Sequence, residues 1–321
     1  MRELKIFAVV AVFSLVLYYG VEPFAHGQMH KHVDSHGLVY DGKADIAEAT
    51  KEKKEAKTKF WAEVSEIAKL KGDVAAGEMG YAMCMGCHMV GAPNMGGVIP
   101  PDLEHAGAIY DKNYLIALVK DPAMASNVDH KYADTMMHPM GSVGSMFPDA
   151  KSIADVVAYL LEKKAGEVTP KVAYEEACMR CHANRYGKLS QLGTAPKTKS
   201  NISTGYDIEG MKHKQKIAEE QAMVATYMGK LPPDLSIIYR ARSHHFLETL
   251  IENPQGQLEG TAMPRVGLNK HGMDKVMTYL QETGDPSKAA REKLGPWVIG
   301  FFVIFTILAY LWKQAHWRDL H

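Results

Sequence analysis

The chain has 321 residues, a length that suggests about two domains of ~150 residues each. Its 37 lysines and arginines balance 37 aspartates and glutamates, so the formal net charge is zero, which argues against nucleic acid as a partner. Hydrophobic residues make up 46% of the sequence, so both length and composition allow a packed core.

The first predicted element is an apolar helix in residues 1–25. Sixteen uncharged, mostly apolar residues follow Arg2 and Lys5. Sixteen is fewer than the ~20 residues that span a bilayer, and a cleaved signal peptide has a similar composition. However, no small-x-small cleavage site precedes "EPFAHG", and Tyr18 and Tyr19 are typical of membrane interfaces. We therefore favour a retained membrane helix over a cleaved signal peptide.

Residues 26–72 are predicted to form a charged helical linker. The stretch "KADIAEATKEKKEAKTKFWAEVSEIAKLKGD" places opposite charges three and four residues apart, which favours a helix that acts as a stalk or brace. The stretch before it contains four histidines, namely His26, His30, His32 and His36. Histidines bind metals, but we favour a solvated segment here.

Two pentapeptides, "CMGCH" and "CMRCH", carry the strongest chemical signal in the chain. In C-x-x-C-H the two thiols form thioether bonds with the vinyl groups of a haem, and the adjacent histidine ligates the iron. The residues concerned are Cys84, Cys87 and His88 in the first motif, and Cys178, Cys181 and His182 in the second.

The alternatives to haem attachment are a zinc site, disulfides or a redox dithiol. A four-thiolate zinc site usually has its two C-x-x-C pairs about 15–20 residues apart, whereas 94 residues separate the starts of these pairs, and a histidine follows each. All four cysteines lie in the two motifs, so none remains for a structural disulfide. We therefore predict two covalently bound haem c groups, each with its iron.

The surroundings of the two motifs form an internal repeat. "PPDL" occurs at 100–103 and at 232–235, and another proline follows 21 residues after the second proline in both copies. The segments "YLIALVKDP" and "FLETLIENP" share apolar residues at helical spacing, and each copy ends in a similar helix. Each half therefore reads as helix, C-x-x-C-H, proline-rich turn, helix, methionine-bearing loop and helix.

This order resembles a small class I cytochrome c domain, present at 73–165 and again at 166–290. In that family the first and last helices cross where a glycine and an aromatic residue meet an aromatic residue. The matching residues are Gly77 and Tyr81 with Tyr159 in the first half, and Tyr174 with Tyr279 in the second.

The same resemblance implies that a backbone carbonyl in the proline-rich turn holds the proximal histidine, because its second ring nitrogen needs a partner. Pro101 and Pro233 are the candidates. The expected fold is mainly α, with two tandem class I cytochrome c domains between an amino-terminal and a carboxyl-terminal transmembrane helix.

The sixth iron ligand in the second half is predicted to be Met263. A methionine opposite the histidine raises the haem potential and suits electron transfer. Met263 lies in "GTAMPRVG", at the usual place before the last helix. The alternatives are His244, His245 and His271.

The first half offers several methionines in "TMMHPMGSVGSMFP". Residues 137–141 read M-x-P-x-G, like the loop of many small cytochromes. Met140 lies nineteen residues before Tyr159, nearer to the common spacing. We favour Met140, then Met137, then Met146, and we expect the remaining methionines to pack in the haem pocket.

Residues 291–321 are predicted to form a second membrane anchor. Nineteen uncharged residues lie between Lys293 and Lys313; as a helix they cover ~28 Å, close to the ~30 Å hydrocarbon core. Trp297 and Trp312 flank them as an aromatic belt. Two spans place both termini on one side of the membrane. Because haem is attached to C-x-x-C-H outside the cytoplasm, the region between the spans is expected to face the periplasm.

The second half carries a more specific resemblance, to cytochrome c1, over residues 166–321. Tyr186 and Leu189 match a tyrosine and a leucine that follow C-x-x-C-H in that family, and "LPPDLSIIYRAR" matches its P-P-D-L-S and A-R stretch. An arginine of that stretch neighbours a haem propionate in the family, so Arg240 and Arg242 are candidates for this contact.

With its additional upstream haem domain, the chain is similar to the dihaem cytochrome c1 subunits of some bacterial quinol:cytochrome c reductases, the cytochrome bc1 complexes. The resemblance implies electron transfer from a Rieske iron–sulfur protein, in a complex with cytochrome b, toward a soluble cytochrome c or a terminal oxidase. It implies no substrate chemistry on this chain. It also implies a location in the bacterial inner membrane, with the haem domains in the periplasm.

Two alternatives come from other classes. A dihaem subunit of a membrane haem–copper (cbb3-type) oxidase also has two C-x-x-C-H motifs and an anchor, but its usual anchor is amino-terminal. A dihaem peroxidase needs an iron position open to peroxide and an acid–base residue beside it. Met263 and the methionine-rich first loop leave no obvious open position.

Overall fold

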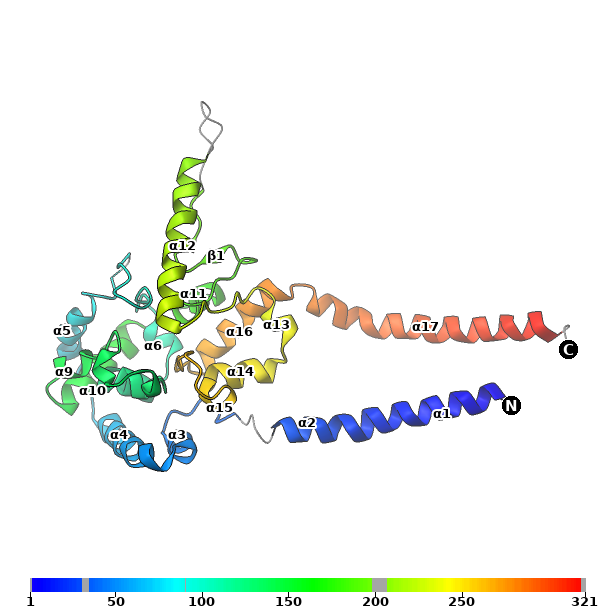
Figure 1. Cartoon of the computed structure of the whole chain (residues 1–321), viewed down its shortest axis with the longest axis horizontal. Helices are drawn as coiled ribbons and strands as arrows, with labels where there is room; N and C mark the ends of the chain where they lie inside the picture. Colours follow the sequence, from blue (N-terminus) through cyan, green and yellow to red (C-terminus); the bar gives the residue numbers. More distant parts are fainter. Residues whose placement is uncertain (1, 31–34, 90, 198–206, 319–321) are drawn as a thin grey trace.

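The computed structural model describes residues 2–30, 35–89, 91–197 and 207–318. As predicted, it is mainly helical, and the regular strands of the described residues are the short hairpin β1 (Leu189–Ser190) and β2 (Gly193–Thr194). The helices between the two termini form one body, from which two long terminal helices extend in the same direction (Figure 1). The body is described below as a first half, residues 73–165, and a second half, residues 166–290.

The first half has its core where its first and last helices cross. Its helices are α5 (Val74–Cys84), α6 (Ala106–Ile109), α7 (Lys112–Lys120), α8 (Pro122–Ala125), η2 (Asp129–Lys131), η3 (Thr135–Met137), α9 (Val143–Met146) and α10 (Ala150–Lys163). A Cβ atom on Gly77 would lie 2.0 Å from the carbonyl oxygen of Asp155, so α5 and α10 approach closely only because this residue is glycine. Tyr81 and Tyr159 also meet, with ring centroids 5.0 Å apart, and both predicted contacts are confirmed.

The second half repeats this crossing with different residues. Its helices are α11 (Pro170–Ala177), α12 (Ile208–Met228), α13 (Ile238–Ala241), α14 (His244–Glu252), α15 (Pro254–Gln257) and α16 (Lys270–Gly284). Helix α11 begins at Pro170 after the N-cap Thr169, and α16 begins after the N-cap Asn269. The two helices are in contact, and the rings of Tyr174 and Tyr279 lie 4.6 Å apart, as predicted.

The two halves are joined by backbone hydrogen bonds. Tyr110 and Leu268 form an antiparallel bridge, and the side-chain amide of Asn269 donates to the carbonyls of Ala108 and Tyr110. The hydroxyl of Tyr114 donates to the carbonyl of Arg265 over 2.7 Å. The segment that follows Met263 is therefore fixed against the first half.

Residues 35–72 form a brace along both halves. It contains α3 (Lys43–Glu48) and α4 (Lys51–Lys69), and α4 buries the apolar face made by Phe60, Trp61, Val64 and Ile67. The carboxylate of Asp45 accepts from two nitrogens of the Arg265 guanidinium and from the indole N–H of Trp61. Both ion-pair partners are buried, so the brace is tied into the interior rather than lying on the surface as a solvated stalk.

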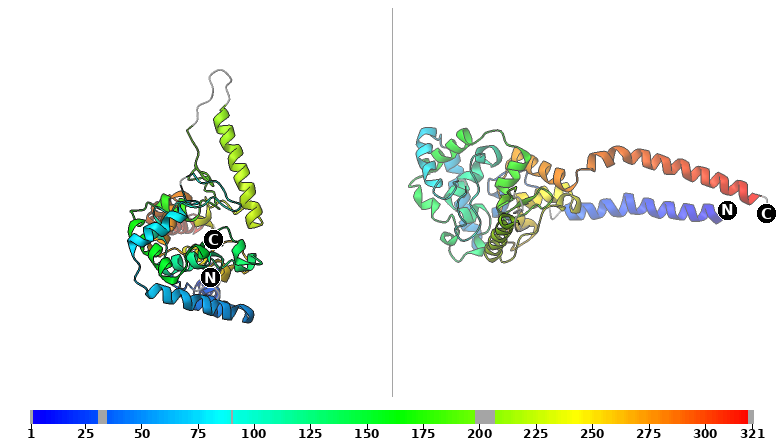
Figure 2. Two further views of the ribbon diagram at one scale, coloured as in Figure 1. Left: turned by 90° about the vertical axis from the view of Figure 1, so that its left-hand side faces the viewer. Right: turned by 90° about the horizontal axis from the view of Figure 1, so that it is seen from above.

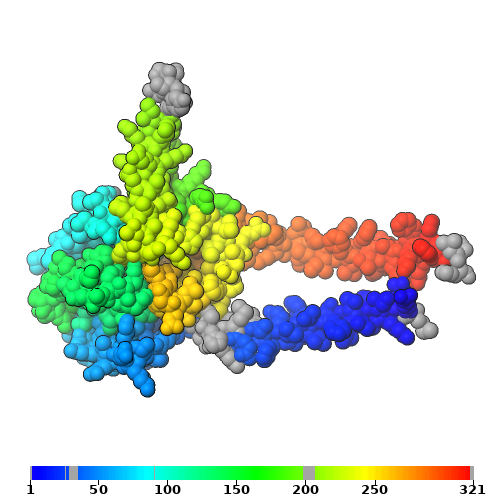
Figure 3. All heavy atoms as spheres, viewed as in Figure 1, coloured from blue at the N-terminus to red at the C-terminus, as the bar shows by residue number. Residues whose placement is uncertain are grey.

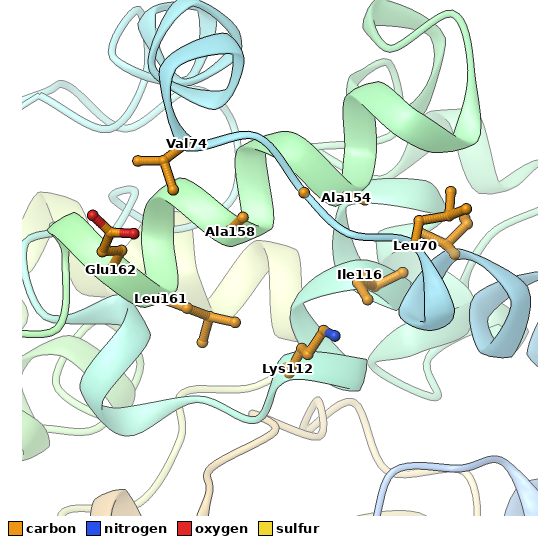
Figure 4. Close-up of a pocket in the computed structure, with 10 residues that line it drawn as sticks. Leu70, Val74, Lys112, Ile116, Ala154, Ala158, Leu161 and Glu162 are labelled. Atoms are coloured by element: carbon orange, nitrogen blue, oxygen red, sulfur yellow. The ribbon is translucent and has the colours of Figure 1, made fainter.

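A shallow hollow lies where the end of α4 approaches α7 and α10 (Figure 4). Leu70, Ile116, Ala158 and Leu161 form its apolar wall. The side chain of Lys112 is directed to the carbonyl of Ala68 over 2.9 Å. This hollow is lined by none of the predicted haem residues.

Helix α12 is an arm that projects away from the body (Figures 1 and 3). Its last turns pack on the first half, where Val224 is fully buried and Glu220 accepts from the amide of Asn94. The hydroxyls of Tyr132 and Tyr227 lie 2.5 Å apart. The base of this second-half helix is therefore part of the wall of the first half.

The terminal helices are exposed and apolar. The first comprises α1 (Arg2–Val16), the π-helical turn η1 (Leu17–Val21) and α2 (Glu22–His30), and the second is α17 (Lys288–Trp317). Both are long and apolar enough to cross a membrane, and their outer ends, the two termini, lie on the same side of the body (Figure 2). Each helix runs beyond its predicted apolar stretch, because helical hydrogen bonding continues through flanking charged residues such as Lys288.

Candidate functional site

The first C-x-x-C-H motif forms a tight turn at the end of α5. The N–H groups of Cys87 and His88 both donate to the carbonyl of Cys84, which brings the two thiols and the imidazole to one side. The Nδ1 atom of His88 lies 2.8 Å from the carbonyl oxygen of Pro101. A carbonyl only accepts, so Nδ1 carries the proton and Nε2 keeps its lone pair. Burial lowers the pKa of His88, which favours the neutral, metal-binding form.

The second motif has the same local geometry. The N–H groups of Cys181 and His182 donate to the carbonyl of Cys178, and Nδ1 of His182 lies 2.8 Å from the carbonyl oxygen of Pro233. Burial again lowers the pKa of the histidine. Both histidines are therefore held in the tautomer that leaves Nε2 free for iron.

The repeated "PPDL" turns have a structural reason. The carboxylate of Asp102 accepts from the N–H of Glu104 over 3.1 Å, and that of Asp234 accepts from the N–H of Ser236 over 2.9 Å. These Asx turns fix the backbone directly after each histidine-binding carbonyl.

The four cysteines are unpaired, and their environment is apolar. Burial raises the pKa of Cys84, raises that of Cys178 to about 12 and raises that of Cys181 to about 11. Reactive dithiols instead lie in electropositive surroundings that lower the thiol pKa. The cysteines therefore fit covalent attachment to an apolar group better than disulfide exchange.

One cavity is lined by the cysteines of both motifs. Its volume is about 340 Å³, within the ~300–1,000 Å³ range of ligand and cofactor sites. Its wall is mostly apolar and includes His88. The second half contributes residues that precede and follow its own motif cysteines, together with Tyr227 and Met228 from the end of α12. The two motifs thus open onto a shared cavity.

Buried polar atoms without partners mark the same wall. The Nε atom of Arg180, the Oε2 atom of Glu176 and the Nε atom of Arg265 are buried without a hydrogen-bond partner in the described chain. All three residues line the shared cavity. An apolar slot with a proximal histidine, two thiols and unsatisfied cationic donors fits a haem, which carries both an apolar ring and two carboxylates.

Some methionines of the first loop line the shared cavity and others do not. Met140 and Met146 line it, whereas Met137 is 67% exposed and Met136 is 54% exposed, and neither is a lining residue. The geometry therefore supports Met140 over Met137 as the distal ligand of the first motif.

His138, which the sequence reasoning overlooked, also lines the cavity. Its Nδ1 atom accepts from the N–H of Met140 over 3.0 Å, and burial lowers its pKa to about 4. In this neutral tautomer Nε2 carries the proton and offers no lone pair to iron. His138 therefore holds the backbone of Met140 in place and is not arranged as a ligand.

In the second half, Met263 is half-buried between Ala262 and Pro264, which both line the shared cavity. Neither Met263 nor His182 is a lining residue, so the predicted ligand pair of the second motif lies outside the lining of the shared cavity. Of the alternative ligands, His244 and His271 are exposed and His245 is half-buried.

Arg240 and Arg242, the predicted neighbours of a propionate, are exposed and do not line the shared cavity. The guanidinium of Arg242 lies over the ring of Phe246, 5.4 Å from its centroid. The cations that do line the cavity are Lys131, Arg180 and Arg265. Arg180 was visible in the sequence, between the cysteines of "CMRCH", but nothing local indicated which way it points.

Of the four histidines in the histidine-rich segment, only the side chain of His36 is among the described residues; the side chains of His26, His30 and His32 lie outside them. Among the described residues, no group of three or more His, Cys, Asp or Glu side chains could hold a metal ion. The side chain of His36 instead approaches Glu48, with 3.5 Å between Nε2 and Oε1.

Comparison with known proteins agrees with this chemistry. Residues 74–164 match the cytochrome c family. The ammonia monooxygenase gamma subunit of Nitrosomonas europaea is 22% identical over 188 residues, which cover 46% of this chain and 80% of that protein. Cytochrome c1 of Allochromatium vinosum is 21% identical over 197 residues, which cover 45% of this chain and 80% of that protein. No solved structure matches.

Residues 74–164 are therefore a cytochrome c domain, which implies covalently bound haem c, and the weak similarity to cytochrome c1 suggests an electron-transfer c-type cytochrome.

Proposed function

We propose that the chain is a membrane-anchored dihaem c-type cytochrome of a quinol:cytochrome c reductase. It accepts electrons from the Rieske iron–sulfur protein and passes them to a soluble cytochrome c or an oxidase. The observation that carries this proposal is the cavity lined by the cysteines of both C-x-x-C-H motifs. Haem supplies one-electron exchange, and the chain supplies attachment, ligation and spacing.

The two haem motifs support electron transfer because they are held alike and lie side by side. Each histidine is oriented by a proline carbonyl at 2.8 Å, so both iron sites have a fixed proximal ligand. The apolar wall keeps water from the cavity and lowers the local dielectric, which raises the haem potential and limits side reactions. We infer tandem cytochrome c domains at 73–165 and 166–290, with Met140 and Met263 as the distal ligands.

The terminal helices support an anchored role. Both are apolar and extend from the same side of the body, so both fit one membrane (Figure 1). The second half leads directly into α17, whereas the first half lies farther from the anchors (Figure 2). We infer that in the bacterial inner membrane the second-half haem lies nearer to cytochrome b and the Rieske protein, on the periplasmic side. The first-half haem then carries the electron outward.

The test is purification of the full chain from gently solubilised native membranes through a tag after His321. We expect a b-type cytochrome, a Rieske protein and two c haems per chain in the same particle. Recovery with a copper-containing oxidase and no Rieske protein would contradict the proposal and favour the oxidase-subunit alternative. Peroxide-dependent oxidation of an added electron donor by the isolated chain would favour the peroxidase alternative.

A further inference from the structure

We propose that Arg180, which lies between the two cysteines of the second haem motif, binds a propionate of the haem held by the first motif. This inference rests on the proposed dihaem function. It assigns a cofactor contact across the two halves, in place of the local contacts expected for Arg240 and Arg242. The contact would make the second motif part of the binding site of the first haem.

The direction of the first haem is set by its attachment. A haem carries its two vinyl groups on one edge of the porphyrin ring and its two propionates on the opposite edge. Attachment to Cys84 and Cys87 at the end of α5 therefore directs the propionates toward the rest of the cavity wall. The second half forms that wall beside Tyr110 and Tyr114, which hydrogen-bond to the carbonyls of Glu176 and Arg265.

Two of the three cations on the wall are already engaged. The Nη atoms of Arg265 are bound to the carboxylate of Asp45. The Nζ atom of Lys131 donates to the backbone carbonyl of Tyr227 over 3.2 Å and lies 4.1 Å from the centroid of the Tyr227 ring. Neither cation is free to form a paired contact with a carboxylate without giving up an existing partner.

Arg180 differs from Arg265, whose Nε atom is likewise without a partner in the described chain but whose Nη atoms bind Asp45. The Nε atom of Arg180 is buried, and within the described chain it has no hydrogen-bond partner. The carboxylates of Asp102 and Glu175 act on Arg180 only through their charge. Glu176 also acts on Arg180 through its charge; its Oε1 atom is 2.6 Å from Nδ1 of His105, and its Oε2 atom has no hydrogen-bond partner in the described chain.

A carboxylate in the cavity would satisfy the buried N–H of Arg180. An arginine binds a carboxylate through two parallel hydrogen bonds, which are stronger and more directional than the contact of a lysine. An unsatisfied buried donor destabilises a fold, so the chain gains stability when the group that fills the cavity brings an acceptor. The positive charge also favours the reduced haem, because reduction lowers the charge on the iron.

The experiment compares Arg180→Gln and Arg180→Lys with Arg185→Gln in the full-length chain within its purified complex. Arg185 follows the same motif but is 82% exposed and lies 3.4 Å from the carboxylate of Asp234. Haem content is measured first, by the pyridine haemochrome assay. Each haem is then titrated by optical and electron paramagnetic resonance spectroscopy between pH 5 and 9.

We expect Arg180→Gln to lower the potential of the first-motif haem more than that of the second. A tenfold fall in its reduced-to-oxidised ratio at fixed ambient potential corresponds to about 59 mV for one electron. The freed propionate should titrate at higher pH, so the pH dependence of this potential should move upward. Arg180→Lys should keep part of the effect of the charge, and Arg185→Gln should change neither haem.

Three outcomes overturn the inference. The first is a first-haem potential and pH dependence unchanged in Arg180→Gln. The second is a shift confined to the second haem. The third is the same shift in Arg185→Gln. If Arg180→Gln does not retain haem, Arg180→Lys gives the result, because a fully wild-type pH profile in that variant also contradicts a bidentate contact. The outcome is independent of co-purification with a Rieske protein, so failure of the proposed function is recognised separately.

Discussion

The two halves hold their histidines in the same way but build the distal side of each site differently. In both, a proline carbonyl binds Nδ1 at 2.8 Å, and two tyrosine rings meet where the first and last helices cross. The first methionine loop is held by His138 and covered by the end of α12. The segment after Met263 is instead fixed by the buried pair of Asp45 and Arg265.

This difference shows which parts of such a domain are self-contained. The proximal side of each site is made within its own half, from the C-x-x-C-H motif and the repeated proline-rich turn, and the repeat therefore preserves it. The distal side depends on segments from elsewhere: α12 of the second half covers the first site, and the brace from residues 35–72 fixes the loop of the second. Each half needs the rest of the chain to complete its candidate haem site. Variants of features that both halves share and of features that belong to one half therefore test the comparison.

Removal of both cysteines of one motif should have the largest effect. Cys84→Ala with Cys87→Ala should leave only the second haem attached, and Cys178→Ala with Cys181→Ala only the first, because both thioether bonds are lost. Denaturing gel electrophoresis with haem staining and the pyridine haemochrome assay measure the remaining haem. Unchanged staining in either double variant would show that the motif does not attach haem.

Replacement of the distal ligand of the first half should change the haem spectrum without loss of haem. Met140→Ala should abolish the near-infrared methionine-to-iron band of this haem and lower its potential by on the order of 0.1 V or more, within the ~0.8 V range that axial ligands control. Met137→Ala is the control, since that side chain is 67% exposed. The reverse result would assign the ligand to Met137.

Asp45→Ala should destabilise the fold by about 3–5 kcal/mol, because it leaves the buried Arg265 guanidinium without its carboxylate. We expect the loss to appear first near Met263, as a weakened methionine-to-iron band of the second haem. Chemical unfolding followed by circular dichroism measures the free energy. Asp41→Ala is the control, because Asp41 pairs with the exposed Lys43 and should cost little.

A side chain added where α5 and α10 cross should destabilise the first half by a smaller amount. Gly77→Ala should cost about 1–3 kcal/mol, since its Cβ would lie 2.0 Å from the carbonyl oxygen of Asp155 and the helices must shift. Lys171 lies the same distance before the second motif but is exposed, so Lys171→Ala should have little effect on the unfolding free energy. Equal losses in both variants would contradict a crossing that depends on Gly77.

The smallest expected effect is a pH dependence from α10. Burial alone would raise the pKa of Asp155, but hydrogen bonds from Lys151 and from the N–H of Asp73 hold it below 3.8. A lowered carboxylate pKa adds stability above pH 3.8 that is lost as the pH falls through the folded-state value. Asp155→Asn should therefore flatten the acid limb of stability against pH, measured by urea unfolding, whereas Asp274→Asn, at an exposed position of α16, should not.

The sequence was sufficient for features that arise from neighbouring residues. The helices follow from local spacing and from the repeat, whereas the tyrosine pairs and the histidine-binding carbonyls of Pro101 and Pro233 follow from the resemblance to class I cytochrome c domains. The apolar face of α4 was also present in the sequence, at the helical spacing of Phe60, Val64 and Ile67. Its many lysines and glutamates directed attention to the exposed face instead.

The sequence was insufficient where distant residues meet. Asp45 and Arg265 are 220 residues apart, and no pattern near either one indicates the other. The position of Arg180 on the wall of a cavity that both halves line has the same origin. The placement of Arg240 and Arg242 on the surface, away from the residues that line the cavity, also has this origin.

The measurement that most directly tests the account is the intact mass of the purified chain under denaturing conditions, where only covalently attached groups remain. The account predicts the mass of the polypeptide plus two haem groups. A mass with one haem or none would contradict the presence of two haems on which the proposed electron path depends.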